Sequence, residues 1–275
     1  DTHTPSDRAE RILVRTMTRF GCFLVAAICL LTHDGVWGYN GGLGRRTLLQ
    51  GVLTASAALV SANPAIAEDM PTKVYFGVGC FWHIQHEIVE AERKLLGRGD
   101  DTITALAGYA GGTQTGKDGR VCYHNMQSIA DYGRLGHGEV VGLEIPESAI
   151  GDFGRVYFDL FRNGERVDPQ DRGGEYRSLI GLPGGMGHPM YPELELAGAD
   201  KGLKLVAGKG NDPDTLGKKL VYVYDTNEFP FHQAEVYHQF HNDFQSPPYG
   251  RKYNQLADQL LDEGRMSATG CPDRV

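Results

Sequence analysis

The chain has 275 residues, and its 35 acidic and 27 basic side chains give a formal net charge of −8. Hydrophobic residues make up 41% of the sequence, which is ordinary for a packed globular protein and too much for a wholly disordered one. The acidic balance argues against a nucleic-acid binder, and the 5 cysteines are too few for a disulfide-dense scaffold.

Residues 1–67 differ from the rest of the chain, and we predict that they form a targeting region. Arg15 and Arg19 precede a short apolar run, which is typical of a secretory signal and places a signal-like segment at 17–33. The run is shorter than the roughly 20 apolar residues that a membrane span needs. Met17 directly precedes this pattern, so we expect translation to start there.

A second signal follows at 45–67. Arg45 and Arg46 form a twin arginine, a mild apolar stretch comes next, and Ala65-Ile66-Ala67 is a small-x-small cleavage site. Two signals in series predict delivery to a plastid, and there to the thylakoid lumen. The alternatives are an uncleaved membrane anchor and a bacterial twin-arginine signal, with the periplasm as destination.

The elements expected after the targeting region alternate between strands and helices, with no internal repeat. We predict strands at 74–78, 103–109, 141–145, 203–207 and 219–224, and an extended segment at 176–182. We predict helices from 81 to a stop at Gly97, at 150–160 and at 229–244, and a glycine-proline-rich loop at 181–192. Residues 68–275 are therefore expected to form one α/β (α+β) domain, with a mixed sheet covered by helices and a ferredoxin-like split βαβ core.

The most informative residue is Cys80, which leaves a hydrophobic strand and opens a helix. Backbone N–H groups at a helix start favour an anion, so we expect the pKa of this thiol to fall below its free value of ~8.5. Phe81 and Trp82 follow directly, and such an aromatic wall suits an apolar or methyl-bearing substrate. The competing interpretation is a buried, inert cysteine.

Six short motifs occur in order between about residues 73 and 241. They are G-C-F-W at 79–82, Y-A-G-G at 109–112, V-C at 121–122, G-H-G-E at 136–139, D-R-G-G-E-Y-R-S at 171–178 and A-E-V-Y-H-Q at 234–239. Each motif is weak alone, but together and in this order they resemble peptide methionine sulfoxide reductase A.

The resemblance implies thiol-dependent reduction of methionine S-sulfoxide, free or in proteins, and a role in repairing oxidised proteins. It also implies a role for each matching residue: Cys80 as nucleophile, Phe81 and Trp82 around the sulfoxide methyl, Glu139 as proton donor, and Asp171 and Tyr176 at the oxygen-binding end. Burial and neighbouring hydroxyls are expected to raise the pKa of Glu139, so that it holds a proton to give.

No metal and no bound cofactor is expected for this chemistry, and the partners implied are a sulfoxide substrate and an external thiol reductant, thioredoxin-like or dithiol. We expect a monomer without nucleic-acid partners and without a membrane segment in its mature form. His232, His238 and His241 are interpreted as hydrogen-bonding residues rather than metal ligands.

The chain departs from the family pattern near the oxygen-binding end. The family tends to have a tyrosine just before the V-C pair, where this chain has Asp-Gly-Arg at 118–120. Tyr132, in an insert at 123–135, either supplies the missing hydroxyl or merely packs on the insert; both interpretations stay open. His83 replaces a glycine, and Glu175 stands where glutamine is usual.

The resolving thiol is a further open point. Cys22 and Cys29 lie in the targeting region, and Cys122 is expected to be a buried, inert thiol. We therefore predict Cys271, near the C-terminus, as the resolving cysteine, with direct reduction of Cys80 as the alternative. Two other functions remain possible from sequence: a sulfoxide-binding relative that does not recycle, and a thiol peroxidase.

Overall fold

The computed structural model describes residues 69–167, 170–244 and 246–272. The predicted targeting region, 1–67, lies outside these residues, as do Cys22 and Cys29. No helix in the described part of the chain is long and apolar enough to cross a membrane.

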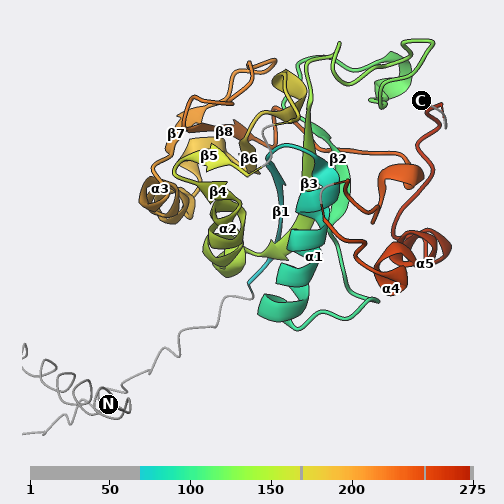
Figure 1. Ribbon diagram of the computed structural model, residues 1–275, viewed down its shortest axis with the longest axis horizontal. Coiled ribbons are helices and arrows are strands. Elements are labelled where there is room, and N and C mark those ends of the chain that lie inside the picture. Colours follow the sequence, from blue (N-terminus) through green and yellow to red (C-terminus); the bar gives the residue numbers. More distant parts are fainter. Residues whose placement is uncertain (1–68, 168–169, 245, 273–275) are drawn as a thin grey trace, which may run out of the picture. The chain divides into compact units, whose positions relative to one another are not determined.

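A seven-stranded mixed sheet forms the centre of the fold (Figure 1). Its strands lie in the order β7-β8-β6-β1-β3-β2-β9, and β1 is antiparallel to both of its neighbours, whereas β8 is parallel to β6 and β7. The strands are β1 (Pro71–Gly77), β2 (Leu106–Ala110), β3 (Gly138–Pro146), β6 (Leu179–Leu182), β7 (Lys204–Ala207), β8 (Leu220–Asp225) and β9 (His232–Gln233), and a separate hairpin comprises β4 (Phe161–Arg162) and β5 (Glu165–Arg166).

The core of this sheet has the predicted split βαβ arrangement. Helix α1 (Phe81–Leu96) follows β1, and α2 (Ile150–Asp159) follows β3. In the chain the elements run β1-α1-β2-β3-α2-β6, while the four strands lie in the order β6-β1-β3-β2, so each βαβ unit has a strand of the other between its own two strands. The predicted mixed sheet with covering helices is confirmed.

Helix α1 begins and ends at the residues that the sequence indicates. Cys80 is its N-cap, with extended backbone (φ −69°, ψ 130°), and Gly97 ends it in the left-handed region at φ 66°. The fully buried Ile84 and Ile88 lie on the face that packs into the core. The helix therefore presents its N-terminus, and with it Cys80, at the end of β1.

The helix predicted at 229–244 is wrong. The segment contains β9, a short 3₁₀ turn at 236–238 and irregular backbone. The Gln239 side chain holds it against β2, because Oε1 accepts from Ala107 N at 2.9 Å and Nε2 donates to Ala107 O at 2.9 Å. Phe240 has a φ of 52°, which a right-handed helix does not allow. Bonds to β2 replace the hydrogen bonds of the expected helix.

Three helices were not predicted from the sequence. They are α3 (Tyr191–Asp200), α4 (Arg251–Asn254) and α5 (Leu256–Asp262). Helix α3 begins where we expected the glycine-proline-rich loop to end, and Pro192 occupies the first turn of this helix, where a missing N–H costs no hydrogen bond.

Candidate active site

A cavity of about 710 Å³ lies where β1 passes into α1. Its walls come from residues 78–83, from Glu139 in β3, from Tyr123, from residues 167 and 170–176, and from residues 243, 244 and 246. It brings together six residues singled out from the sequence: Cys80, Phe81, Trp82, Glu139, Asp171 and Tyr176.

Two glycines allow Cys80 to sit beside Glu139. A Cβ at Gly77 would collide with the carbonyl oxygen of Glu139, so only glycine lets β1 approach β3 this closely. Gly79 turns the chain at φ 67°, and its N–H donates to Tyr176 O at 3.2 Å. The V-G-C-F sequence thus joins the turn at Cys80 to β3 on one side and to the loop that carries Tyr176 on the other.

The Cys80 thiol is the one free cysteine among the described residues, and it is half-buried. Burial and the nearby carboxylate of Glu139 raise its pKa above the ordinary value, although the N–H groups of Trp82 and His83 act in the opposite direction. The predicted lowering of this pKa is therefore wrong. The helix start does contribute, but loss of water and a like charge outweigh it.

Glu139 projects from β3 into the base of the cavity and is only 1% exposed. Its Oε2 accepts from Phe81 N at 2.9 Å and its Oε1 from the Tyr132 hydroxyl at 3.0 Å. Burial raises its pKa to about 8, although these two hydrogen bonds lower it in part. Glu139 is consequently protonated at neutral pH and carries an O–H that it can donate, as expected.

Aromatic side chains form the other wall of the cavity. Trp82 and Phe81 follow the thiol, and His241 stacks on the Trp82 ring with centroids 4.0 Å apart and planes at 26°. Phe244, which is 89% exposed, meets the Trp82 ring edge-on at 5.1 Å. Phe244 lines the cavity, and His241 acts only through its stacking on Trp82; both roles were missed from sequence, because the segment was expected to be a helix.

Tyr132 is fully buried, behind Glu139. Its ring stacks between those of Tyr109 at 4.6 Å and Tyr123 at 5.5 Å, and its hydroxyl donates to Glu139. The insert at 123–135 thus both packs the ring and brings a hydroxyl to the carboxyl group. Tyr123, which the sequence did not single out, lines the cavity beside Phe81, with ring centroids 6.5 Å apart.

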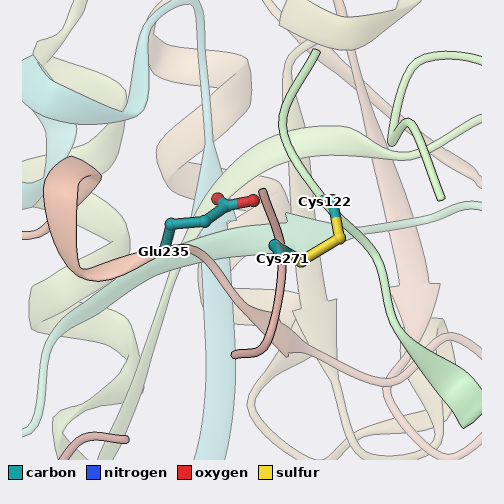
Figure 2. A group of neighbouring side chains, drawn as sticks. All are labelled: Cys122, Glu235 and Cys271. Atoms are coloured by element: carbon teal, nitrogen blue, oxygen red, sulfur yellow. A yellow bond between two sulfur atoms is a disulfide. The ribbon is translucent and has the colours of Figure 1, made fainter. Parts of the chain in front are cut away.

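The two remaining cysteines of the described chain form a disulfide, Cys122–Cys271, beside the Glu235 side chain (Figure 2). The prediction that Cys122 is an inert free thiol is wrong, and Cys271 is bonded to Cys122 rather than placed against Cys80. The two sulfur atoms and a Glu235 carboxylate oxygen lie within 4.8 Å of one another, a spacing that could hold a metal ion. However, the two sulfurs are bonded to each other, and Glu235 accepts hydrogen bonds from Tyr109 Oη and Tyr123 N, both at 2.8 Å. The cluster is therefore a disulfide crosslink and not a metal site.

This crosslink attaches the C-terminal segment to the wall of the site. The two cysteines are 149 positions apart, and closing a loop of that length stabilises the fold by ~5 kcal/mol in the chain-entropy view. Arg120 reinforces the attachment by donating to Gly270 O at 2.6 Å. Tyr123, directly after Cys122, is thereby held at the cavity.

Comparison with known proteins gives matches among solved structures alone. Models of protein families and curated protein sequences give none. Methionine sulfoxide reductase A of Corynebacterium diphtheriae is 18% identical, with 63% of this chain and 74% of that chain covered and a TM-score of 0.37. For Mxr1 from Saccharomyces cerevisiae in reduced form the identity is 18%, the coverage 62% and 84%, and the TM-score 0.39.

The same yeast protein in an unusual oxidised form is 19% identical, with 66% of this chain and 88% of that chain covered and a TM-score of 0.33. Methionine sulfoxide reductase A is also the family that the six sequence motifs resemble.

Proposed function

We propose that this protein reduces methionine sulfoxide with Cys80 as the nucleophile and Glu139 as the proton donor. One observation carries the proposal: a free thiol and a buried carboxyl group with a pKa of about 8 share one cavity, and aromatic rings form its other wall. A sulfoxide needs this combination, because its oxygen is a poor leaving group until it is protonated. The rings of Phe81 and Trp82 would hold the methyl group.

In the proposed reaction Glu139 gives its proton to the sulfoxide oxygen while the Cys80 sulfur attacks the sulfoxide sulfur. The thiol proton passes to the Glu139 carboxylate, so the carboxyl group is restored. The sulfur–oxygen bond of the substrate then breaks and the O–H group moves to the sulfur of Cys80, while the sulfur–sulfur bond made by the attack breaks and its electron pair returns to the methionine sulfur. Methionine sulfur gains two electrons and cysteine sulfur loses two, which gives methionine and a sulfenic acid. Asp171 and Tyr176 would orient the oxygen.

A dithiol such as a thioredoxin-like protein would return Cys80 to the thiol. Direct reduction converts the sulfenic acid and the dithiol into the Cys80 thiol, water and the disulfide of the reductant. The route through Cys271 would require that a dithiol first open the Cys122–Cys271 bond, after which Cys271 could attack Cys80. The pairing with Cys122 favours the direct route for the oxidised protein.

The proposal is tested with peptides that carry the S or the R epimer of methionine sulfoxide, mixed with the protein without reductant. We expect the S epimer to yield about one equivalent of methionine, and mass spectrometry to find one added oxygen on the Cys80 peptide. The R epimer is the control, and we expect it to give neither methionine nor an added oxygen on the Cys80 peptide. Absence of methionine formation from either epimer would contradict the proposal, and faster consumption of hydroperoxide would favour a thiol peroxidase.

Tyr132→Phe tests whether the hydroxyl of the insert acts on Glu139. Because that hydrogen bond lowers the pKa of Glu139, we expect its loss to move the alkaline limb of kcat/KM to higher pH and to reduce the rate roughly tenfold. Tyr109→Phe is the matched control, since its hydroxyl bonds to Glu235 instead. An unchanged pH profile and rate would mean that Tyr132 only packs on the insert.

A further inference from the structure

The loop that carries Asp171 and Tyr176 is held from behind by a buried arginine. Arg166, at the end of β5, is only 6% exposed. Its Nη1 donates to Tyr176 O at 2.8 Å, and its Nη2 donates to Asp171 O. One guanidinium group thus binds the backbone carbonyl groups of Asp171 and Tyr176, the two ends of the loop 171–176.

Asp214 completes this arrangement from a different part of the chain. Its Oδ1 pairs with Arg166 Nη1 at 3.0 Å, and its Oδ2 accepts from Gly173 N, in the middle of the loop, at 2.8 Å. Although burial acts in the opposite direction, these hydrogen bonds and the arginine charge lower the pKa of Asp214, so it stays ionised. The loop is therefore fixed at three points by one ion pair.

Neither member of this ion pair lines the cavity, whereas Asp171 and Tyr176 do. A guanidinium group can make these contacts at once because its donors form a rigid planar fork, which a lysine ammonium group lacks. We propose that Arg166 and Asp214 are positioning residues, which hold Asp171 and Tyr176 at the oxygen end of the cavity. This inference rests on the proposed function.

The loop also affects the electrostatics of the site. Several titratable groups face Glu139: Tyr132 and Tyr123 from the insert, and Cys80 from the start of α1. The loop contributes three more, which are Asp171, Glu175 and Tyr176. The Asp171 charge raises the pKa of Cys80 and of Glu139. A loop displaced away from the cavity would thus lower both pKa values.

The decisive variant is Arg166→Lys, because it keeps the charge and removes the fork. We expect kcat/KM for an S-sulfoxide peptide to fall about 10- to 100-fold, as for small misplacements of reacting groups. The alkaline limb of the pH profile is expected to move to lower pH, and Cys80 to be alkylated faster by iodoacetamide at one fixed pH, as located by mass spectrometry. Asp214→Asn keeps the shape of the side chain. We expect it to change kcat/KM, the alkaline limb and the alkylation rate of Cys80 in the same directions as Arg166→Lys does.

Arg98→Lys is the matched control. Arg98 pairs with the buried Glu92 and also donates to Thr104 Oγ1, on residues that do not line the cavity. This variant is expected to lower Tm without changing the pH profile or the alkylation of Cys80.

The outcomes separate the two proposals. If Arg166→Lys lowers Tm as the control does but leaves kcat/KM, pH profile and alkylation unchanged, the positioning role is wrong. If the wild-type protein reduces no sulfoxide, the proposed function fails, and the alkylation rate alone still decides whether Arg166 holds the loop. Should Arg166→Lys fail to fold, Asp214→Asn provides the same three measurements.

Discussion

Replacing Cys80 with serine will abolish the reduction of an S-sulfoxide peptide, with a loss of ~10³-fold or more in kcat. Serine has nearly the size of cysteine, but its hydroxyl is a far weaker nucleophile and cannot store the oxygen as a sulfenic acid. Cys80 is also the one free thiol in the described part of the chain, so no neighbouring thiol there can replace it. The measurement is methionine formed per protein, by chromatography, first without reductant, so that the Cys122–Cys271 disulfide stays closed, and then with dithiothreitol to obtain kcat.

The double variant Cys122→Ser/Cys271→Ser is the control for this experiment. It removes the other two cysteines of the described chain and substitutes none of the residues that line the cavity. We expect it to form one equivalent of methionine without reductant, as the wild type does, with a lower Tm because the crosslink is lost. Turnover retained by Cys80→Ser would refute the proposed mechanism.

Replacing Glu139 with glutamine will lower kcat/KM about 10²- to 10⁴-fold, the usual contribution of a positioned general acid. In the wild type Glu139 holds its proton below its pKa of about 8 and loses it above. We therefore expect kcat/KM to be high at neutral pH and to fall tenfold per pH unit above about 8. Glutamine cannot titrate, so the variant is expected to lack this alkaline limb.

A second measurement distinguishes lost acid catalysis from a disrupted site. The Glu139 carboxylate raises the pKa of Cys80, so Glu139→Gln is expected to increase Cys80 alkylation at pH 9, even as turnover falls. Glutamine can still accept from Phe81 N, which limits the structural change. An alkaline limb that persists in the variant would show that another group titrates there.

The elements that could be predicted from sequence are those with a clear local pattern of apolar residues and end signals. Strand β1, helix α1 and the stop at Gly97 follow from periodicity and from a glycine that adopts a left-handed conformation. The segment at 229–244 is rich in aromatic residues and was expected to be a helix, yet Gln239 bonds to Ala107, 132 positions away. No local sequence pattern predicts a hydrogen bond between residues so far apart in the chain.

The candidate site shows the same division. The motifs predicted which residues would meet, and Cys80, Glu139, Asp171 and Tyr176 do share one cavity. The sign of the pKa shift at Cys80 was not predictable, because it depends on how deeply the thiol is buried and on how near Glu139 lies.

The residues that fix the loop and the cavity wall without lining the cavity also could not be predicted from sequence. Arg166 and Asp214 are 48 positions apart and belong to none of the six motifs. Cys122 and Cys271, 149 positions apart, gave no sign of pairing with each other.

The Cys122–Cys271 bond also makes the number of reactive thiols a readout of the redox state. In the oxidised state, residues 69–167, 170–244 and 246–272 carry one titratable sulfhydryl, and it is the proposed nucleophile. A chromogenic thiol reagent applied to a chain that lacks residues 1–67 would thus label the active site alone. After mild reduction the same titration would give three equivalents, because the Cys122–Cys271 disulfide opens. Thiol counts between one and three, measured over a series of reductant concentrations, would give the midpoint of disulfide reduction, which is the midpoint for release of the C-terminal segment.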